Sequence, residues 1–428
     1  MKLNAWYKKR GIRFIYERAK RLNQRYNVDA GKAIARIQHC LEVLEPYDCP
    51  PTFFVPAVVA RRNLTFIREL QAQGCEIGVH GYQHVDMKSY SASDASSQLV
   101  HAAERFIDMG LEVYGFRCPY LSASDELLHE LPKNLFKYSS NRAIQWSYRN
   151  QAVNVPQRFF ETLQEFYLPL SAESNMSLPW MQEDMVEVPV CVPDDLQLYD
   201  GLDCTLEEIS GLWSDLLQQT QQRGELFNLI FHPELSKLCD GPFVAVLKEA
   251  RQAPNKVWVT RLRDISAWWR EKETFSADIE KENGGYLLNF HRSHRGTLLY
   301  RGFEDQQPST PWDKKYRRLR SLQMAVKGPV LPLIGLLPGT PEWVNSSLQR
   351  MGYLVASGEN TQKCSLLIDS NFIERNNNPV LLIAHIESLD LPLIRFWPWP
   401  DGYRSALCLT GDLDALSLMD YATRLLPV

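Results

Sequence analysis

Short hydrophobic segments alternate with longer amphipathic segments through the first part of the chain. Between about residues 30 and 270 the short segments have the length of β-strands, and several are hydrophobic at successive positions. A strand that is hydrophobic on both faces is typical of a parallel sheet covered by helices. We therefore expect an α/β fold with strands near Thr52–Pro56, Glu76–His80, Tyr114–Pro119, Phe136–Ser140, Val186–Val192, Phe227–His232 and Val257–Leu262.

The helices between these strands have recognisable ends. Asp29 can cap a helix whose hydrophobic positions recur on one face, and Thr205 with Glu208 has the spacing of a capping box. Gly74 and Gly110 stand where helices should end before the next strand. Six or more βα units in succession favour a barrel over an open sheet.

The pattern changes after residue 275. The polar, acidic stretch Ser276–Gly285 predicts a linker. Residues 286–400 are predicted to form a smaller α/β unit, and residues 403–428 a strand, an acidic turn and a helix. In the smaller unit we expect a helix from Thr340 to Arg350 and strands near Val330–Ile334, Tyr353–Ala356, Ser365–Asp369 and Val380–His385.

Composition and charge narrow the functional classes. A net charge of −4 gives no indication of a nucleic-acid partner, because such proteins usually carry a basic surface. The nine cysteines are odd in number and scattered, which is typical of reduced thiols rather than disulfides. The N-terminus lacks the apolar core of a signal peptide, and no apolar run has the length of a membrane span. We therefore expect a cytoplasmic protein without a transmembrane segment.

Two pairs of residues have metal-ligand character. His80 and His84 are four positions apart at the end of a predicted strand, a common way to supply two nitrogens to one cation. Asp412 and Asp414 follow the last predicted strand, so one acid can bind a cation while the other acts as a base. Each pair also has an ordinary explanation, as polar loop residues or, for Asp414, as a helix cap.

Two further residues end strands on the same side of the predicted fold. Arg117 can hold a carboxylate in one orientation, and His232 can donate a proton. Alone, each is equally consistent with a structural role. Because the carboxyl ends of parallel strands meet at one mouth of a barrel, their joint occurrence with His80 and His84 predicts a site there.

The order of these motifs resembles the polysaccharide deacetylase (NodB-homology) family. The resemblance covers about residues 10–270 and 403–428, and it depends on four segments: Pro51–Val55, Glu76–His84, Arg117–Tyr120 and Leu229–Pro233. It implies a distorted (β/α) barrel of seven or eight strands, with a smaller α/β accessory domain inserted before a C-terminal strand that completes the barrel. The implied domains are residues 1–275, 286–400 and 403–428.

The acid pair that should come first in this family stands last here. No acid pair precedes Thr52, whereas Asp412 and Asp414 occur at the end of the chain with Leu413 between them. This order suggests a circular permutation, which is feasible because the termini of a domain often lie close together. The alternative is that the two acids complete the site of a neighbouring chain in a homo-oligomer.

The resemblance also implies roles for individual residues. Asp414, His80 and His84 would bind a divalent metal, with zinc favoured and manganese, iron or cobalt also suited to these ligands. Asp412 would be the catalytic base and Arg117 would orient it. The Tyr120 backbone N–H would bind the oxyanion, and His232 would protonate the leaving amine. The family often has an acid that orients this histidine, and Asp195 is our candidate for it.

The implied reaction is metal-dependent hydrolysis of an N-acetyl amide on an amino sugar, in a glycan or a glycan precursor. Tyr82, Tyr120 and Trp146 are candidates for stacking on a sugar ring, although aromatic side chains more often pack in the core. Two alternatives remain: a metal-dependent hydrolase of a small cyclic amide or imide, and an inactive carbohydrate-binding relative. The second would lead if Asp412 and Asp414 did not reach His80.

Overall fold

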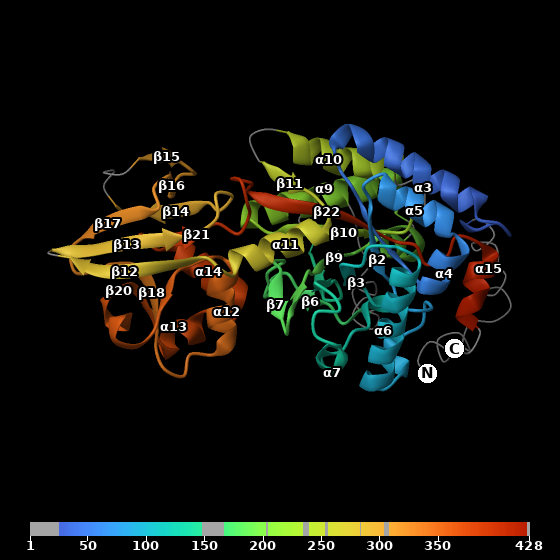
Figure 1. The fold of residues 1–428 in the computed structure, drawn as a ribbon. Coiled ribbons are helices and arrows are strands. Elements are labelled where there is room, and N and C mark those ends of the chain that lie inside the picture. The colour runs from blue at the N-terminus through green and yellow to red at the C-terminus, as the bar shows by residue number, and fades with distance from the viewer. Residues whose placement is uncertain are drawn as a thin grey trace.

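The structure is a computed structural model that describes residues 25–147, 167–202, 204–233, 239–252, 256–282, 284–303 and 308–425. The N-terminal stretch on which the prediction of a cytoplasmic location depended lies outside these residues. Figure 1 shows two parts side by side, with the last long strand running from one into the other. Within the described residues, no helix combines the length and apolar character needed to cross a membrane.

A curled, mostly parallel sheet forms the larger part and confirms the predicted distorted (β/α) barrel. The pairings run from β10 through β22, β1, β2 and β3 to β4. At one end of this order β4 pairs with β8, and at the other end β10 pairs with β9, which pairs with β5. The strands are β1 (Thr52–Val55), β2 (Glu76–Val79), β3 (Gly115–Phe116), β4 (Tyr138–Ser139), β5 (Ala143–Gln145), β8 (Met185–Glu187), β9 (Val190–Val192), β10 (Leu226–Phe231) and β22 (Ser405–Asp412). Three shorter strands, β6 (Leu170–Ser171), β7 (Trp180–Gln182) and β11 (Val257–Val259), pair with strands of this sheet.

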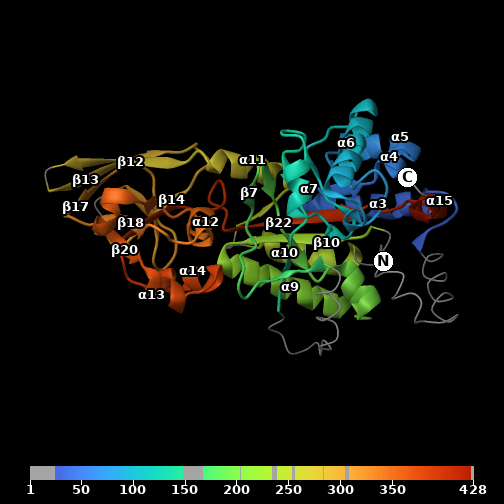
Figure 2. The ribbon, with the colours of Figure 1, turned by 90° about the horizontal axis from the view of Figure 1, so that it is seen from below.

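Helices surround the sheet, as Figure 2 shows from below. They are α3 (Gly31–Leu44), α4 (Ala57–Arg62), α5 (Leu64–Ala72), α6 (Ala92–Asp108), α7 (Asp125–Glu130), α9 (Leu206–Arg223), α10 (Val244–Arg251) and α11 (Leu262–Lys272). The capping box of Thr205 and Glu208 is confirmed, and Gly74 and Gly110 have the positive φ expected of helix ends. Asp29 accepts a hydrogen bond from the Gly31 N–H, but the cap residue of α3 is Ala30.

The last strand of the chain lies inside the sheet. Strand β22 pairs in parallel with β10 along most of its length and with β1 at its carboxyl end. All eight of its residues are buried. Gly411 is needed here, because a Cβ atom at this position would lie 2.7 Å from the Phe53 ring. The C-terminal segment is therefore packed between two strands from much earlier in the chain.

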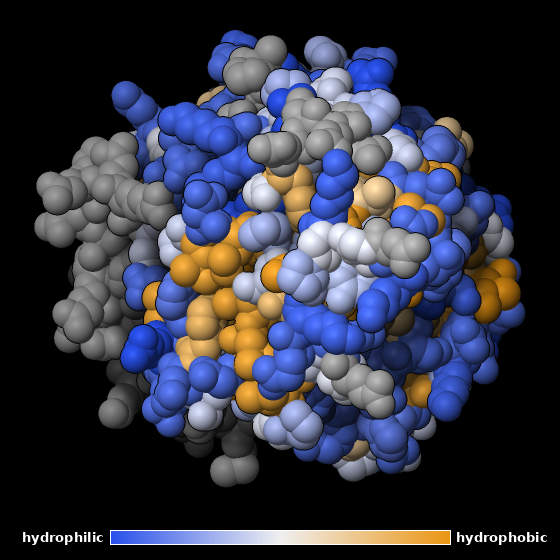
Figure 3. Space-filling view, turned by 90° about the vertical axis from the view of Figure 1, so that its left-hand side faces the viewer, coloured by the Kyte–Doolittle hydropathy of each residue, from blue (hydrophilic) through white to orange (hydrophobic). Residues whose placement is uncertain are grey.

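Residues 276–396, the accessory segment, form three small sheets. The first two are antiparallel: β12 (Ser276–Glu282), β13 (Gly285–His291) and β17 (Gln323–Lys327), and β15 (Ser309–Pro311), β16 (Arg317–Leu319), β14 (Leu298–Arg301) and β21 (Leu393–Phe396). The third is parallel, with β18 (Leu331–Leu336) between β19 (Val355–Ala356) and β20 (Cys364–Ile368). Helices α12 (Glu342–Arg350), α13 (Ser370–Arg375) and α14 (Pro379–Ser388) belong to this part. Figure 3 shows its free end, where polar side chains surround a group of hydrophobic ones.

Two predictions for the accessory segment were wrong. The expected linker is strand β12, in which Ala277 and Ile279 alternate with polar residues and pack against a buried cluster. Its polar composition concealed this period of two. The expected strand Val380–His385 is part of helix α14, which begins because the Asn378 side chain caps it and Pro379 occupies its first turn.

Buried tryptophan side chains lie where the accessory segment joins the barrel. Trp268 and Trp269 of α11 are fully buried, as is Trp399, which precedes β22. The Trp268 Nε1–H donates to the Pro398 carbonyl at 2.8 Å, and the Trp399 Nε1–H donates to the Gly224 carbonyl at 2.8 Å. The hydrophobic core is therefore continuous across the junction and fixes where β22 enters the barrel.

A buried carboxylate bridges the break between β4 and β5. One Glu187 oxygen accepts the backbone N–H groups of Asn141 and Arg142, each at 2.7 Å, and the other accepts the Ser139 hydroxyl. The side chain thus supplies the partners that the interrupted strand ladder lacks. Buried N–H groups without acceptors are costly, so this carboxylate stabilises the sheet at this break.

Glu187→Ala should lower the free energy of unfolding by about 2–4 kcal/mol, because a buried and a partly buried N–H group lose their acceptor. Glu187→Gln keeps one acceptor oxygen and should fall between this variant and the wild type. Urea unfolding followed by circular dichroism would measure both. The exposed Glu173 offers a control, since Glu173→Ala should change stability by less than about 0.5 kcal/mol. Equal stability of Glu187→Ala and wild type would contradict the assigned role.

Candidate active site

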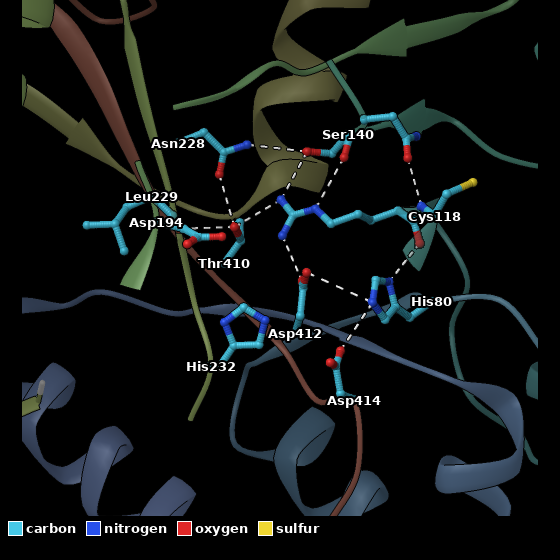
Figure 4. Close-up of polar contacts among 12 residues, drawn as sticks. His80, Cys118, Ser140, Asp194, Asn228, Leu229, His232, Thr410, Asp412 and Asp414 are labelled. Carbon is cyan, nitrogen blue, oxygen red and sulfur yellow. Dashed lines mark hydrogen bonds and ion pairs between the residues drawn. The ribbon is translucent and has the colours of Figure 1, made fainter. Parts of the chain in front are cut away.

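The ends of three neighbouring strands build the site. Strand β22 ends at Asp412, which is paired with Phe54 of β1, and the Leu413 N–H donates to the Phe54 carbonyl at 2.8 Å. His80 follows β2 directly, and its backbone N–H donates to the Val55 carbonyl at 3.0 Å. Because β22, β1 and β2 are parallel neighbours, their carboxyl ends bring the two acids next to His80 (Figure 4).

His80, His84 and Asp414 form one cluster. A ligand atom from each residue lies within 4.8 Å of the others. Asp414 Oδ1 is 3.4 Å from His80 Nε2 and 3.2 Å from His84 Nε2. Both imidazoles are buried, and their ring centroids are 5.1 Å apart. The structure thus brings together the three residues that the sequence singled out as metal ligands, and it does so within one chain.

The chemistry of these three residues fits a cation. His80 Nδ1 lies 2.8 Å from the Arg117 carbonyl, which can only accept, so the Nε2 of a neutral ring carries a lone pair toward Asp414. Asp414 Oδ1 is buried and has no hydrogen-bond donor. Two imidazole nitrogens and a carboxylate oxygen that face one another are the donor set of a divalent metal site.

The charges of the cluster agree with this fit. Burial, followed by the positive charge of Arg424, lowers the pKa of His84 to about 4, which keeps its ring neutral. Burial alone would raise the pKa of Asp414, but His84 and Arg424 hold it well below its usual value. A neutral imidazole and an ionised carboxylate are the forms that bind metals.

Arg117 holds the second acid in one orientation. Its side chain is fully buried, and Nη1 donates to Asp412 Oδ1 at 2.8 Å. The other nitrogens of the guanidinium donate to the Ser140 carbonyl, the Ser140 hydroxyl and the Thr410 hydroxyl. Asp412 Oδ2 stays 3.9 Å from His80 Nε2. One carboxylate oxygen is therefore held by arginine, and the other faces the candidate metal site.

The sequence reasoning missed the polar layer beneath Arg117. Asn228 donates to the Ser140 hydroxyl at 3.3 Å and to the Pro189 carbonyl at 3.0 Å, and it accepts from the Thr410 hydroxyl at 3.2 Å. Two signals were available. Thr410 lies two positions before Asp412 and so on the same face of β22, and Asn228 is a polar residue inside an otherwise hydrophobic strand.

His232 lies at the same mouth, at the end of β10. Its Nδ1 is 2.8 Å from Asp195 Oδ1, and its backbone N–H donates to Asp195 Oδ2 at 2.6 Å. Asp195 is fully buried. The carboxylate thus fixes the ring, and an Nδ1–H donated to Asp195 leaves Nε2 for other partners. The structure places the predicted partner, Asp195, in contact with this histidine.

The three predicted aromatic residues lie in different surroundings. Tyr120 has a positive φ of 59°, and its ring centroid is 4.8 Å from that of His84. Trp146 is buried, with the Arg223 guanidinium 4.9 Å from its ring centroid, and Tyr82 packs at 4.7 Å against His101. Of the three, Tyr120 borders the histidine–aspartate cluster.

Two features after β22 differ from the expectation. The predicted helix begins at Leu418 rather than directly after Asp414, and Ser417 caps it. The explanation of Asp414 as a helix cap is therefore wrong. In addition, Arg424 Nη2 lies 3.0 Å from Asp414 Oδ2, a contact for which the sequence pattern gave no signal.

These features define a class of protein: a distorted (β/α) barrel with two imidazoles and a carboxylate at the carboxyl ends of its strands. Residues 27–138 match the family model described as polysaccharide deacetylase, the family that the motifs resemble. The chain is 37% identical over 89 residues to a chitin deacetylase of Colletotrichum lindemuthianum, covering 19% of this chain and 36% of that protein. It is 33% identical over 90 residues to a chitooligosaccharide deacetylase of Sinorhizobium fredii, covering 21% and 42%.

Among solved structures, an allantoinase is similar with a TM-score of 0.41 and 16% identity, covering 55% of this chain and 72% of that chain. The chain spans less than half the length of the curated relatives named above.

A second acid beside Asp195 makes stability depend on pH. Burial and the adjacent Asp195 raise the pKa of Asp194 to about 7, well above its value in an unfolded chain. The folded protein therefore holds a proton that the unfolded chain releases. The resulting stabilisation is complete below the unfolded pKa and is lost as the pH rises toward 7.

Asp194→Asn should therefore weaken the fall in unfolding free energy that wild type shows between about pH 4 and 7. Urea unfolding of metal-free protein across this range would measure it. Asp108, exposed on α6, provides the control, because Asp108→Asn should leave the pH dependence of wild type in place. If unfolding free energy changed with pH to the same extent in wild type and Asp194→Asn, the pH dependence assigned to Asp194 would be wrong.

Proposed function

We propose that the protein is a metal-dependent deacetylase that hydrolyses the N-acetyl amide of an amino sugar in a glycan or a glycan precursor. The observation that carries this proposal is the meeting of His80, His84 and Asp414 beside an arginine-held Asp412. The matching relatives support the substrate class, since two of them are named for chitin and chitooligosaccharide deacetylation.

His80, His84 and Asp414 would hold the metal, with zinc favoured and manganese, iron or cobalt also compatible with two imidazoles and a carboxylate. When bound, a divalent cation lowers the pKa of water and polarises a carbonyl oxygen. The buried position of both imidazoles supports this role, because it keeps competing water away from the ligands.

Asp412 would act as the base. Its Oδ1 is held by Arg117, so Oδ2 can accept the proton of the water that attacks the amide carbon. The Tyr120 backbone N–H would donate to the oxygen on which negative charge develops. The positive φ of Tyr120 supports this role, because backbone held in an unusual conformation is common at such sites.

His232 would supply the proton for the leaving amine. An amine leaves poorly as an anion, so a nearby acid is required. The Asp195 carboxylate, 2.8 Å from Nδ1, would hold the ring with Nε2 available.

We also infer that the order of motifs reflects a circular permutation, with residues 403–428 as the displaced first strand of the barrel. The division into residues 1–275, a smaller domain and this C-terminal strand follows from it. The parallel pairing of β22 with β1 supports this interpretation, because a family member with the acid pair first would place that strand beside β1.

Metal analysis tests the proposed ligands. Wild type loaded with zinc should retain about one ion per chain after gel filtration, and His80→Ala and Asp414→Ala should each retain almost none. His101→Ala, on the partly exposed face of α6, should bind like wild type. Equal metal content in all four proteins would remove the proposed site.

Acetate release tests the reaction. Metal-loaded wild type should release acetate from an N-acetylglucosamine oligomer, and Asp412→Asn should reduce the rate by about 10²–10⁴-fold with its metal content unchanged. Asp401→Asn, on the exposed turn before β22, should keep the wild-type rate. Wild-type rates in Asp412→Asn would exclude it as the base.

A further inference from the structure

The chain continues past Asp414 into a short tail that is anchored on α4. The tail contains α15 (Leu418–Ala422), and the Leu418 N–H donates to the Asn27 carbonyl at 2.8 Å. Asp420 is buried, and its side chain accepts from Arg62 at 3.2 Å and from the Leu416 backbone at 3.2 Å. These contacts fix the direction in which the tail leaves the barrel.

The end of this tail returns to the candidate metal site. Arg424 lies in the turn Thr423–Leu425, with its guanidinium 4.8 Å from the ring centroid of Tyr421. Its Nη2 is 3.0 Å from Asp414 Oδ2, and both side chains are largely buried, with 15% and 12% exposed. The two oxygens of Asp414 therefore have different partners, since Oδ1 faces the imidazoles and Oδ2 faces the guanidinium.

We propose that Arg424 is a positioning residue that sets the affinity of the metal site by occupying Asp414 Oδ2. This inference rests on the proposed metal-binding function of His80, His84 and Asp414. Because Oδ2 is paired with a cation, Oδ1 is the oxygen that Asp414 offers to a metal.

The charge of Arg424 should lower the affinity for a metal, whereas most side chains that contact a metal ligand raise it. A carboxylate that orients a ligating histidine makes it a better donor. A guanidinium on a ligating carboxylate instead withdraws negative charge and places a positive charge near the cation. Arg424 should therefore weaken metal binding while it fixes the orientation of Asp414, and a more weakly held cation is a stronger Lewis acid.

Arg424→Met tests this role through metal binding itself. The variant removes the charge but keeps an unbranched apolar side chain of similar length at this position. Chelator competition with zinc should show tighter binding than in wild type, on the order of 10-fold to 100-fold, the scale known for outer partners of metal ligands. With cobalt in place of zinc, the visible absorption should weaken, because a freed Oδ2 raises the coordination number.

Two further variants separate position from charge. Arg424→Lys retains a positive charge without the planar fork and should bind zinc with an affinity between those of wild type and Arg424→Met. Arg61→Met removes the same charge from the exposed surface of α4 and should bind zinc like wild type. Thermal unfolding followed by circular dichroism would show whether each variant is folded.

Zinc affinity in Arg424→Met that equals or falls below that of wild type would overturn the inference, as would an unchanged cobalt spectrum. This outcome is distinct from failure of the proposed function. If the proposed function were wrong, wild type itself would bind no zinc, and His80→Ala would not lower zinc binding further.

Discussion

The docking of β22 between β10 and β1 is the interaction on which the rest of the site depends. Its pairing register with β1 places Asp412 opposite Phe54. Only β1 separates β22 from β2, the strand that leads to His80. Side chains alternate along a strand, so a shift of one residue would turn Thr410 and Asp412 away from Arg117. The burial of all eight residues of β22 and the lack of space at Gly411 resist such a shift.

Around this strand, the structure places charges that compensate one another. Arg117 is fully buried, and it is stabilised by Asp412, by hydroxyl and carbonyl acceptors, and by the Phe54 ring 4.3 Å from its Cζ. On the other side of the site, the positive charge of Arg424 compensates the negative charge of Asp414. A buried charge without a partner costs several kcal/mol, so each acid is held by one arginine while its second oxygen stays near the imidazoles. This arrangement explains why two carboxylates can lie at one barrel mouth.

Local sequence patterns predicted most of the barrel and the residues that converge at its mouth. The strands before His80 and His232 are short hydrophobic runs, and parallel strands present their carboxyl ends at one edge. The sequence could not show the contact of Arg424 with Asp414, because it depends on how the tail folds back over α4. Nor could hydrophobic patterning reveal β12, whose outer face is charged and whose inner face is supplied by small and branched residues such as Ala277 and Ile279. In α14, a continuous hydrophobic run suits a helix as well as a strand, and the cap at Asn378 decides between them.

We propose that Asp414, which follows the last strand, completes a cation site with His80 and His84 from much earlier in the sequence. X-ray diffraction from crystals grown with zinc, recorded on both sides of the zinc absorption edge, would locate the bound ion. We expect one strong anomalous peak within bonding distance of His80 Nε2, His84 Nε2 and Asp414 Oδ1. An anomalous map with no peak among these three atoms, or with its strongest peak on other residues, would show that the proposed site is wrong.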